Sequence, residues 1–214
     1  MTAQTLLDEL EGGPEKVEQM SFDQLAASEL EQPELPAVAP MARSAAPVTG
    51  RHQDLCLYIV VLLKSFVEAL DAGLVRDAPF DVCLDDQHTF QPDVLFVSHH
   101  NYDRVHETYV EGPPDIIIEV LTVESTARDR GEKFAAYEAA GVSEYWIVDP
   151  IREMADLYHL GPDGYYDAFR PDIAGRLRSR VLRGFMLDLD LLWKRVLPTT
   201  AETVEMVQGM IAQR

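Results

Sequence analysis

Apolar side chains recur at helical spacing between residues 53 and 71: Leu55, Ile59, Leu62, Leu63, Phe66, Val67 and Leu70. Because residues three and four positions apart share one face of an α-helix, this spacing predicts an amphipathic helix that packs on a core. Gly73 follows the last apolar position, where glycine is typical of a helix end. Other helices are predicted at 129–140, before Gly141, and at 189–195 and 200–213.

Apolar runs of strand length lie between the predicted helices. Residues 115–121 are apolar apart from two acidic positions, Asp115 and Glu119, and such a run is typical of a central strand covered on both faces. Further strands are predicted at 80–84, 93–97, 144–149, 154–159 and 165–169, the last two as a hairpin. This order predicts an α/β domain in which helices flank a mixed β-sheet.

The ends of the chain differ from its centre. Residues 1–20 are acidic and are interrupted by Gly12-Gly13-Pro14, so we expect a loosely ordered extension there. Ser21 and Gln24 resemble a capping box that begins a short helix. We therefore divide the chain into the extension at 1–20, a main domain at 21–197 and a C-terminal helix at 198–214.

The formal net charge of −19 opposes nucleic-acid binding, which needs positive surface. The charge is uneven, however, and basic residues gather at Arg128, Arg130 and Lys133 and again at Arg176, Arg178, Arg180 and Arg183. If Arg176, Arg178 and Arg180 lie on one strand, their alternation places them on one face. That face is either a phosphate-contacting surface or a solvated edge protected by charge.

Two absences narrow the function classes. No run approaches the roughly 20 apolar residues of a membrane-spanning helix, and the N-terminus lacks the features of a signal peptide, so we expect a cytoplasmic protein. Cys56 and Cys83 are the two cysteines and form no CxxC motif. This argues against a structural zinc site and predicts two buried, reduced thiols.

Three residues carry the chemistry: Asp93, Glu119 and Lys133. A carboxylate inside a buried strand is costly unless it is paired or bound to a metal ion. If the strands that carry Asp93 and Glu119 are neighbours, the two carboxylates meet, and a cation is their natural counter-charge. Asp129, Lys133 and Tyr137 share one helix face, either as part of this site or as an exposed Asp–Lys pair.

Four segments together resemble the Uma-two family of restriction-endonuclease-like proteins, which has the PD-(D/E)XK nuclease fold: residues 91–97, 114–122, 128–133 and 140–150. The resemblance extends over roughly residues 21–193. It implies that Asp93 and Glu119 bind Mg²⁺ or Mn²⁺. It also implies that Lys133 is a catalytic lysine that has moved from the strand, where Leu121 now stands, onto the following helix.

The resemblance also implies further site residues. Glu34 is an additional ligand or base, although Gln32-Pro33 replaces the Asp-Gly turn of the family beside it. Asp129 and Tyr137 support the site. His52 matches a histidine at the start of the first long helix, where the alternative is an ordinary polar residue at a helix N-terminus.

The function that follows from the resemblance is Mg²⁺-dependent endonucleolytic hydrolysis of DNA, with Arg128, Arg130, Arg176 and Arg178 as DNA-contacting candidates. The alternative is a non-catalytic binding or regulatory module that keeps the fold, which the net charge and the added negative charge of Glu124 favour. A hydrolase that acts on something other than nucleic acid is the third possibility. A homodimer stays open, since nucleases that cut both strands often act as symmetric dimers.

Overall fold

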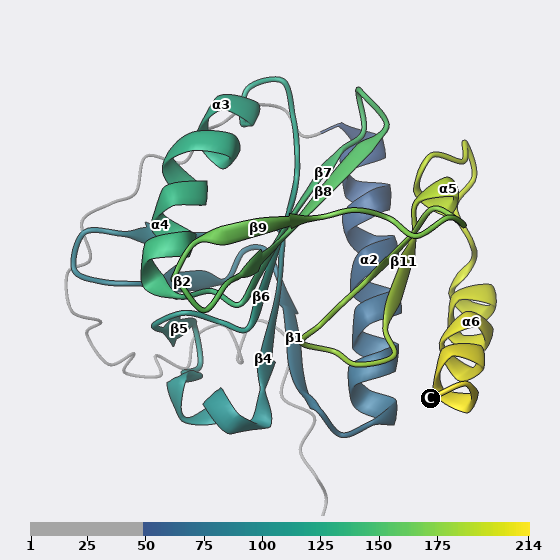
Figure 1. The fold of residues 1–214 in the computed structure, drawn as a ribbon, viewed down its shortest axis with the longest axis horizontal. Coiled ribbons are helices and arrows are strands. Elements are labelled where there is room, and N and C mark those ends of the chain that lie inside the picture. The colour runs from purple at the N-terminus through teal and green to yellow at the C-terminus, as the bar shows by residue number, and fades with distance from the viewer. Residues whose placement is uncertain (1–48) are drawn as a thin grey trace, which may run out of the picture. The chain divides into compact units, whose positions relative to one another are not determined.

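The computed structural model of the chain describes residues 49–214 (Figure 1). The predicted extension at 1–20, the helix expected from Ser21 and the candidate Glu34 lie outside the described residues. Among residues 49–214, no helix combines the length and the apolar character needed to cross a membrane.

A six-stranded mixed sheet forms the centre of the described domain, as the sequence predicts. In spatial order its strands are β1 (Gly73–Asp77), β4 (Val94–Ser98), β6 (Ile116–Val120), β7 (Glu144–Asp149), β8 (Met154–Leu160) and β9 (Tyr166–Phe169). Only β6 and β7 pair in parallel, and all the other neighbours are antiparallel. The predicted hairpin at 154–169 is the pair β8–β9.

The long helix α2 (Gly50–Ala69) covers one face of this sheet. Its apolar stripe packs on Ile116, Ile118 and Val120 of β6, within a core that also includes Val207 and Met210. These last two belong to α6 (Thr200–Ala212), which packs against α2 and begins with a capping box between Thr199 and Glu202. The short helix α5 (Leu189–Leu192) precedes α6.

A smaller core lies on the opposite face, beneath the connection from β6 to β7. This connection runs through α3 (Thr126–Arg128), a π-helical turn η2 (Asp129–Lys133) and α4 (Phe134–Ala140). Ile117 of β6 packs there with Tyr137 and Tyr145. Neighbouring residues of β6 thus face different cores, so Glu119 shares the α4 face with Ile117, as the strand alternation predicts.

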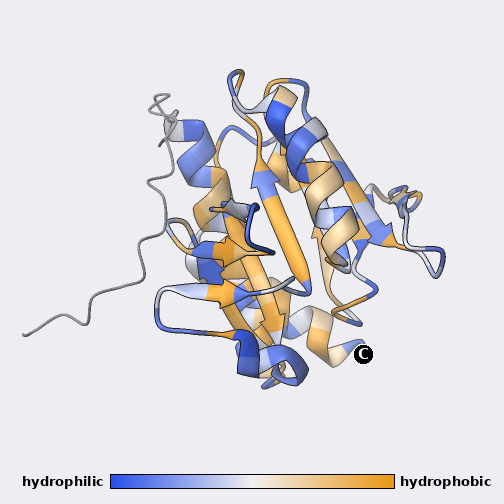
Figure 2. Ribbon diagram, turned by 90° about the vertical axis from the view of Figure 1, so that its left-hand side faces the viewer, coloured by the Kyte–Doolittle hydropathy of each residue, from blue (hydrophilic) through white to orange (hydrophobic). Residues whose placement is uncertain are grey.

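Shorter strands complete the domain. The strands β2 (Asp81–Cys83), β3 (Thr89–Phe90) and β5 (Tyr109–Glu111) form a three-stranded sheet, and β10 (Arg176–Arg178) pairs with β11 (Met186–Asp188). The segment 99–112 contains the 3₁₀ helix η1 (His99–Arg104) as well as β5. Figure 2 shows that the strands of the domain are mainly hydrophobic, while hydrophilic residues gather in connections and helix ends.

Gly73 has a different role from the predicted helix end. The helix α2 ends at Ala69, and the chain then reverses through Asp71, whose φ is 48°. Gly73 is the first residue of β1 and lies opposite Ser98 of the neighbouring strand β4. A Cβ atom on Gly73 would lie 2.1 Å from the carbonyl oxygen of Val97. Glycine is therefore required by the approach of two backbones.

Candidate active site

The carboxylates of Asp93 and Glu119 meet at one end of β6. Strand β4 pairs directly with β6, with Val94 opposite Ile118, so the expected adjacency of the two strands is confirmed. Asp93 immediately precedes β4, and its Oδ2 accepts a hydrogen bond of 2.7 Å from the backbone N–H of Val120. This bond holds the Asp93 carboxylate against the strand end that carries Glu119.

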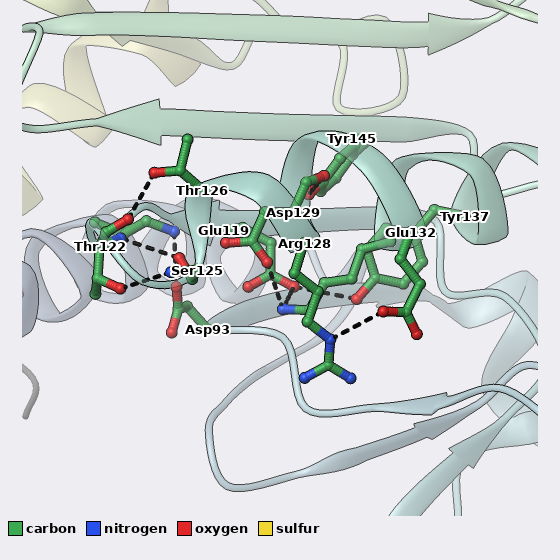
Figure 3. A network of polar contacts seen from close by, with 12 residues as sticks. Asp93, Glu119, Thr122, Ser125, Thr126, Arg128, Asp129, Glu132, Tyr137 and Tyr145 are labelled. Carbon is green, nitrogen blue, oxygen red and sulfur yellow. Dashed lines mark hydrogen bonds and ion pairs between the residues drawn. The ribbon is translucent and has the colours of Figure 1, made fainter. Parts of the chain in front are cut away.

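Lys133 joins two buried carboxylates from different elements. Its Nζ lies 2.7 Å from Oε1 of Glu119 and 2.8 Å from Oδ1 of Asp129. The hydroxyl of Tyr137 donates a 3.1 Å hydrogen bond to the same Oε1 of Glu119. All four side chains are buried, and Figure 3 shows Glu119 and Asp129 side by side with Asp93 nearby. The Asp129–Lys133 pair is therefore part of an interior cluster, and the exposed pair weighed from the sequence is wrong.

Side-chain hydroxyl groups of Thr122, Ser125 and Thr126 hold the backbone that follows Glu119 (Figure 3). The Thr122 N–H donates to Oγ of Ser125 at 3.0 Å, and the Ser125 N–H donates to Oγ1 of Thr122 at 3.1 Å. The hydroxyl of Thr126 donates to the Thr122 carbonyl at 2.6 Å. These bonds fix the turn that carries the chain from β6 into α3, so the lysine returns over the strand end.

A π-helical turn carries both Asp129 and Lys133. Single π turns within helices are rare and often occur at functional sites, because the wider turn re-aims side chains. Asp129 and Lys133 are both turned into the interior, and Tyr145 fixes the turn by donating to the Asp129 carbonyl at 3.0 Å. The sequence predicts a regular helix at 129–140, and the structure replaces its first turn with this one.

The buried charges of Glu119, Asp129 and Lys133 shift the pKa values of their neighbours. Burial raises the pKa of Glu119 to about 8, helped by Asp93 and Asp129 and opposed by the ammonium of Lys133. Burial opposes the charge on Lys133, but the carboxylates of Glu119 and Asp129 outweigh it and raise the lysine pKa. Lys133 therefore stays protonated, and a further positive charge beside Glu119 would lower the pKa of the glutamate.

His52 lies on the other side of Asp93. Its Nε2 is 3.3 Å from Oδ1 of Asp93, and this hydrogen bond raises the pKa of His52 although burial opposes the shift. Within residues 49–214 the buried Nδ1 of His52 has no hydrogen-bond partner. The structure thus places His52, at the start of α2, beside the carboxylate of Asp93.

The arginines singled out as DNA contacts are engaged in ion pairs. Arg128 lies 3.5 Å from Glu132, and Arg130 lies 2.8 Å from Asp156. Arg176 and Arg178 both pair with Asp172, at 3.3 and 3.4 Å. Strand β10 packs its Leu177 into the α2 core, on the face of the sheet opposite Lys133. The structure therefore brings Arg128 and Arg130 near the site and leaves Arg176 and Arg178 away from it.

The predicted stripe of three arginines on one strand is wrong. Strand β10 ends at Arg178, so Arg180 lies beyond it. The Arg180 N–H donates to Oε1 of Glu144 at 2.6 Å, and its guanidinium covers the ring of Phe169 at 4.2 Å. The buried carboxylate of Glu144 fixes the path of the backbone after β10, because it also accepts hydrogen bonds from Trp146, Ser179 and Val181.

Cys56 lies beside the candidate site, and the sequence analysis did not single it out. Potential ligand atoms of His52, Cys56 and Asp93 all lie within 4.8 Å of one another. The spacing of four residues between His52 and Cys56 on a predicted helix was the available signal. Cys56 and Cys83 are also partly exposed rather than buried. Burial and the carboxylates of Asp93 and Glu119 raise the pKa of the Cys56 thiol.

The donor set of Asp93 and Glu119 suits a hard divalent cation. Carboxylate oxygens are the ligands that Mg²⁺ and Mn²⁺ prefer. In the described part of the chain, both hydrogen bonds to Glu119 go to Oε1, which leaves Oε2 for a cation. A cation there would also offset the repulsion between the negative charges of Asp93, Glu119 and Asp129, which is stronger inside the protein than in water.

Comparisons with known proteins give a family and a fold for this chain. Residues 22–190 match the Uma2 family model, described as "Putative restriction endonuclease". A solved structure from Anabaena variabilis, described as a "putative nuclease belonging to DUF820", superposes with a TM-score of 0.57 at 17% identity. The alignment covers 69% of this chain and 83% of that one. No curated protein matches the chain.

Proposed function

This chain belongs to the Uma2 family of restriction-endonuclease-like proteins, and from that premise we propose that it is a divalent-metal-dependent endonuclease that hydrolyses phosphodiester bonds of DNA. The observation that carries the proposal is the cluster of Asp93, Glu119 and Lys133, in which Glu119 and Lys133 are buried and Asp93 is partly exposed. Three charged groups from a strand start, a strand and a helical turn converge there, and ion pairs hold the latter two at 2.7 Å. A purely structural role would not require this convergence at one strand end.

We assign the metal to Asp93 and Glu119, with Mg²⁺ or Mn²⁺ as the ion. When bound, such an ion polarises a phosphoryl oxygen and lowers the pKa of a water molecule. Asp93 is held in place for this role by the Val120 N–H, and Glu119 by Lys133 and Tyr137. Glu34 stays a candidate for a further ligand or base and lies outside the described residues.

Lys133 has two tasks in the proposed mechanism. Its ammonium has several protons, so while it donates to Glu119 and Asp129 it can also hold an attacking water beside the phosphorus. Its charge then offsets the negative charge that develops on the phosphoryl oxygens. Asp129 and Tyr137 act by fixing Lys133 and Glu119, and His52 acts by fixing Asp93.

The test is a cleavage assay on end-labelled single- and double-stranded DNA at low salt, comparing Mg²⁺, Mn²⁺ and EDTA. We expect metal-dependent cleavage that is lost in Lys133→Ala and Glu119→Ala. Lys64→Ala is the matched control, because Lys64 is an exposed lysine on α2. Cleavage that survives in Lys133→Ala, or no cleavage by folded protein with either metal, would contradict the proposal.

The second candidate is a non-catalytic binding or regulatory module, and the pairing of the arginines favours it. Arg130, Arg176 and Arg178 are engaged by carboxylates of their own chain, so a DNA backbone would have to compete for them. This module would bind a partner without turnover in the same assay. The proposed nuclease would act in the cytoplasm, either as a monomer or as a homodimer.

A further inference from the structure

A second metal-binding arrangement adjoins the proposed Mg²⁺ site, and it is built from different chemistry. His52 and Cys56 lie one turn apart on α2, and Asp93 faces them from the start of β4. We propose that His52, Cys56 and Asp93 form a site for a borderline transition-metal ion such as Zn²⁺ or Co²⁺. Imidazole nitrogen, thiolate sulfur and carboxylate oxygen together favour such ions over Mg²⁺.

The spacing of the donor atoms fits a tetrahedral ion. With bonds of about 2.0–2.1 Å to nitrogen and oxygen, neighbouring ligand atoms of a tetrahedron are about 3.3–3.4 Å apart. Nε2 of His52 and Oδ1 of Asp93 are 3.3 Å apart. The Cys56 sulfur lies within 4.8 Å of both partners, so a small side-chain rotation completes three corners.

The histidine is arranged for such a ligand. A neutral imidazole that binds a metal through Nε2 carries its proton on Nδ1. Within residues 49–214, Nδ1 of His52 is buried and has no partner, so no hydrogen bond in this part of the chain opposes that tautomer. An ion at Nε2 would replace only the proton shared with Asp93.

An open pocket leads to the three donors. His52, Cys56 and Asp93 all line it, together with Asp77 at the end of β1. The pocket gives an ion a route from solvent and leaves the fourth corner to water, as in zinc sites with three protein ligands. The carboxylates of Asp77 and Asp93 make this entrance attractive to cations. A cysteine that merely filled space in the core would not need this access.

The two sites share Asp93, so they compete. If the Oδ1 of Asp93, which already faces His52, is bound to Zn²⁺, it is withdrawn from the hard cation beside Glu119. Zn²⁺ would then inhibit Mg²⁺-driven cleavage. This consequence rests on the proposed nuclease function, whereas the metal site itself does not.

The direct test uses Co²⁺ alone as the probe with the full chain. Thiolate coordination to Co²⁺ gives a near-ultraviolet charge-transfer absorption that carboxylates do not give. We expect this absorption to saturate at one ion per chain in the wild type and to vanish in Cys56→Ser. Cys83→Ser is the matched control, because Cys83 is the other cysteine and lies on β2, outside the cluster.

Further variants separate this site from the proposed catalytic one. Glu119→Gln should keep the Co²⁺ absorption, since Glu119 is not one of its three ligands, and His52→Ala should lose it. Circular dichroism establishes that Cys56→Ser is folded, and Cys56→Ser alone decides the outcome if His52→Ala does not fold. No charge-transfer absorption in the wild type, or its persistence in Cys56→Ser, would overturn the proposal.

A competition assay tests the functional consequence. With Mg²⁺ present, Cys56→Ser should need more than about tenfold more Zn²⁺ for half inhibition of cleavage than the wild type, the scale of affinity lost when a metal site is weakened. Equal inhibition of both proteins would refute the competition for Asp93. If the protein cleaves no DNA, the Co²⁺ titration still decides whether the site exists.

Discussion

Lys133 reaches back across fourteen positions of the chain to Glu119, and its Nζ lies 2.7 Å from the glutamate Oε1 inside the protein. Asp129, one π turn earlier, binds the same ammonium at 2.8 Å. The three side chains form a buried group of two carboxylates and one cation. This group carries one excess negative charge, which a proton or a further cation would offset, and this excess underlies the first two predictions.

Loss of the ammonium should destabilise the protein strongly. Lys133→Met keeps the aliphatic length but leaves two buried carboxylates without their cation, which costs about 3 kcal/mol in unfolding free energy. The double variant Lys133→Met/Glu119→Gln should recover part of that loss, because it removes one of the uncompensated charges. Urea unfolding at pH 8 in EDTA measures the unfolding free energy of both variants. If the loss in the double variant equalled the sum of the losses from the two single substitutions, Lys133 and Glu119 would not be coupled.

The stability of the metal-free protein should depend on the protonation of Glu119. Its folded pKa of about 8 lies above its ordinary value of 4.5. A raised pKa contributes stability that is complete below the unfolded value and is lost as pH rises through the folded value. The advantage of the wild type over Glu119→Gln should therefore shrink from about pH 5 to about pH 9. Thermal unfolding in EDTA across this range tests it, and a constant difference would contradict the shifted pKa.

Removal of the tyrosine hydroxyl should weaken the site without abolishing it. Tyr137→Phe deletes one 3.1 Å hydrogen bond to Glu119, which costs about 1 kcal/mol of stability. Cleavage should slow by much less than in Lys133→Ala, because Glu119 keeps its ion pair. Tyr165→Phe is the control, since Tyr165 is 67% exposed. A complete loss of cleavage in Tyr137→Phe would instead give the hydroxyl a direct chemical role.

Glu144 should be a stability residue with no part in the chemistry. Its carboxylate is fully buried and accepts four hydrogen bonds, from Trp146, Ser179, Arg180 and Val181. Glu144→Leu leaves these donors unsatisfied and should cost about 3 kcal/mol or more in chemical unfolding. The exposed Glu132→Leu should change stability by less than about 1 kcal/mol. Similar losses for the two variants would show that the buried network contributes little.

A methyl group at Gly73 should disturb the start of β1. The added Cβ would meet the Val97 carbonyl oxygen at 2.1 Å, so Gly73→Ala should cost at least about 2 kcal/mol. Gly209→Ala, within α6 and with open space around it, should instead stabilise by about 0.5–1 kcal/mol. Opposite signs in thermal unfolding are the expected result, and a tolerated Gly73→Ala would mean that the two strands can separate.

The sequence predicted the parts of the site that depend on local periodicity. Strand alternation placed Glu119 on the same face as Ile117, and helical spacing grouped Asp129, Lys133 and Tyr137. Both inferences hold because side-chain direction within one element is fixed by its backbone geometry. The central sheet was also predictable from the sequence, because a continuous apolar run of strand length is typical of a strand that is covered on both faces.

Features that depend on contacts between distant segments were not predictable. Arg130 meets Asp156 across 26 positions, and Glu144 meets Val181 across 37, so spacing alone gives no sign of either contact. The π turn at 129–133 and the proximity of Cys56 to Asp93 likewise follow from packing between elements. By contrast, the partners of Arg128, Arg176 and Arg178 are carboxylates only four to six positions away.

Because the side chains of β6 face two different cores, the number of residues in this strand is also constrained. Ile116, Ile118 and Val120 face α2, while Ile117 and Glu119 face α4. Because strand side chains alternate strictly, deleting one residue within 116–118 would exchange the two sets for every position beyond it. Such a deletion would push the glutamate into the apolar layer under α2 and present an isoleucine or valine to the lysine. This strand should therefore tolerate changes of residue far better than changes of residue number.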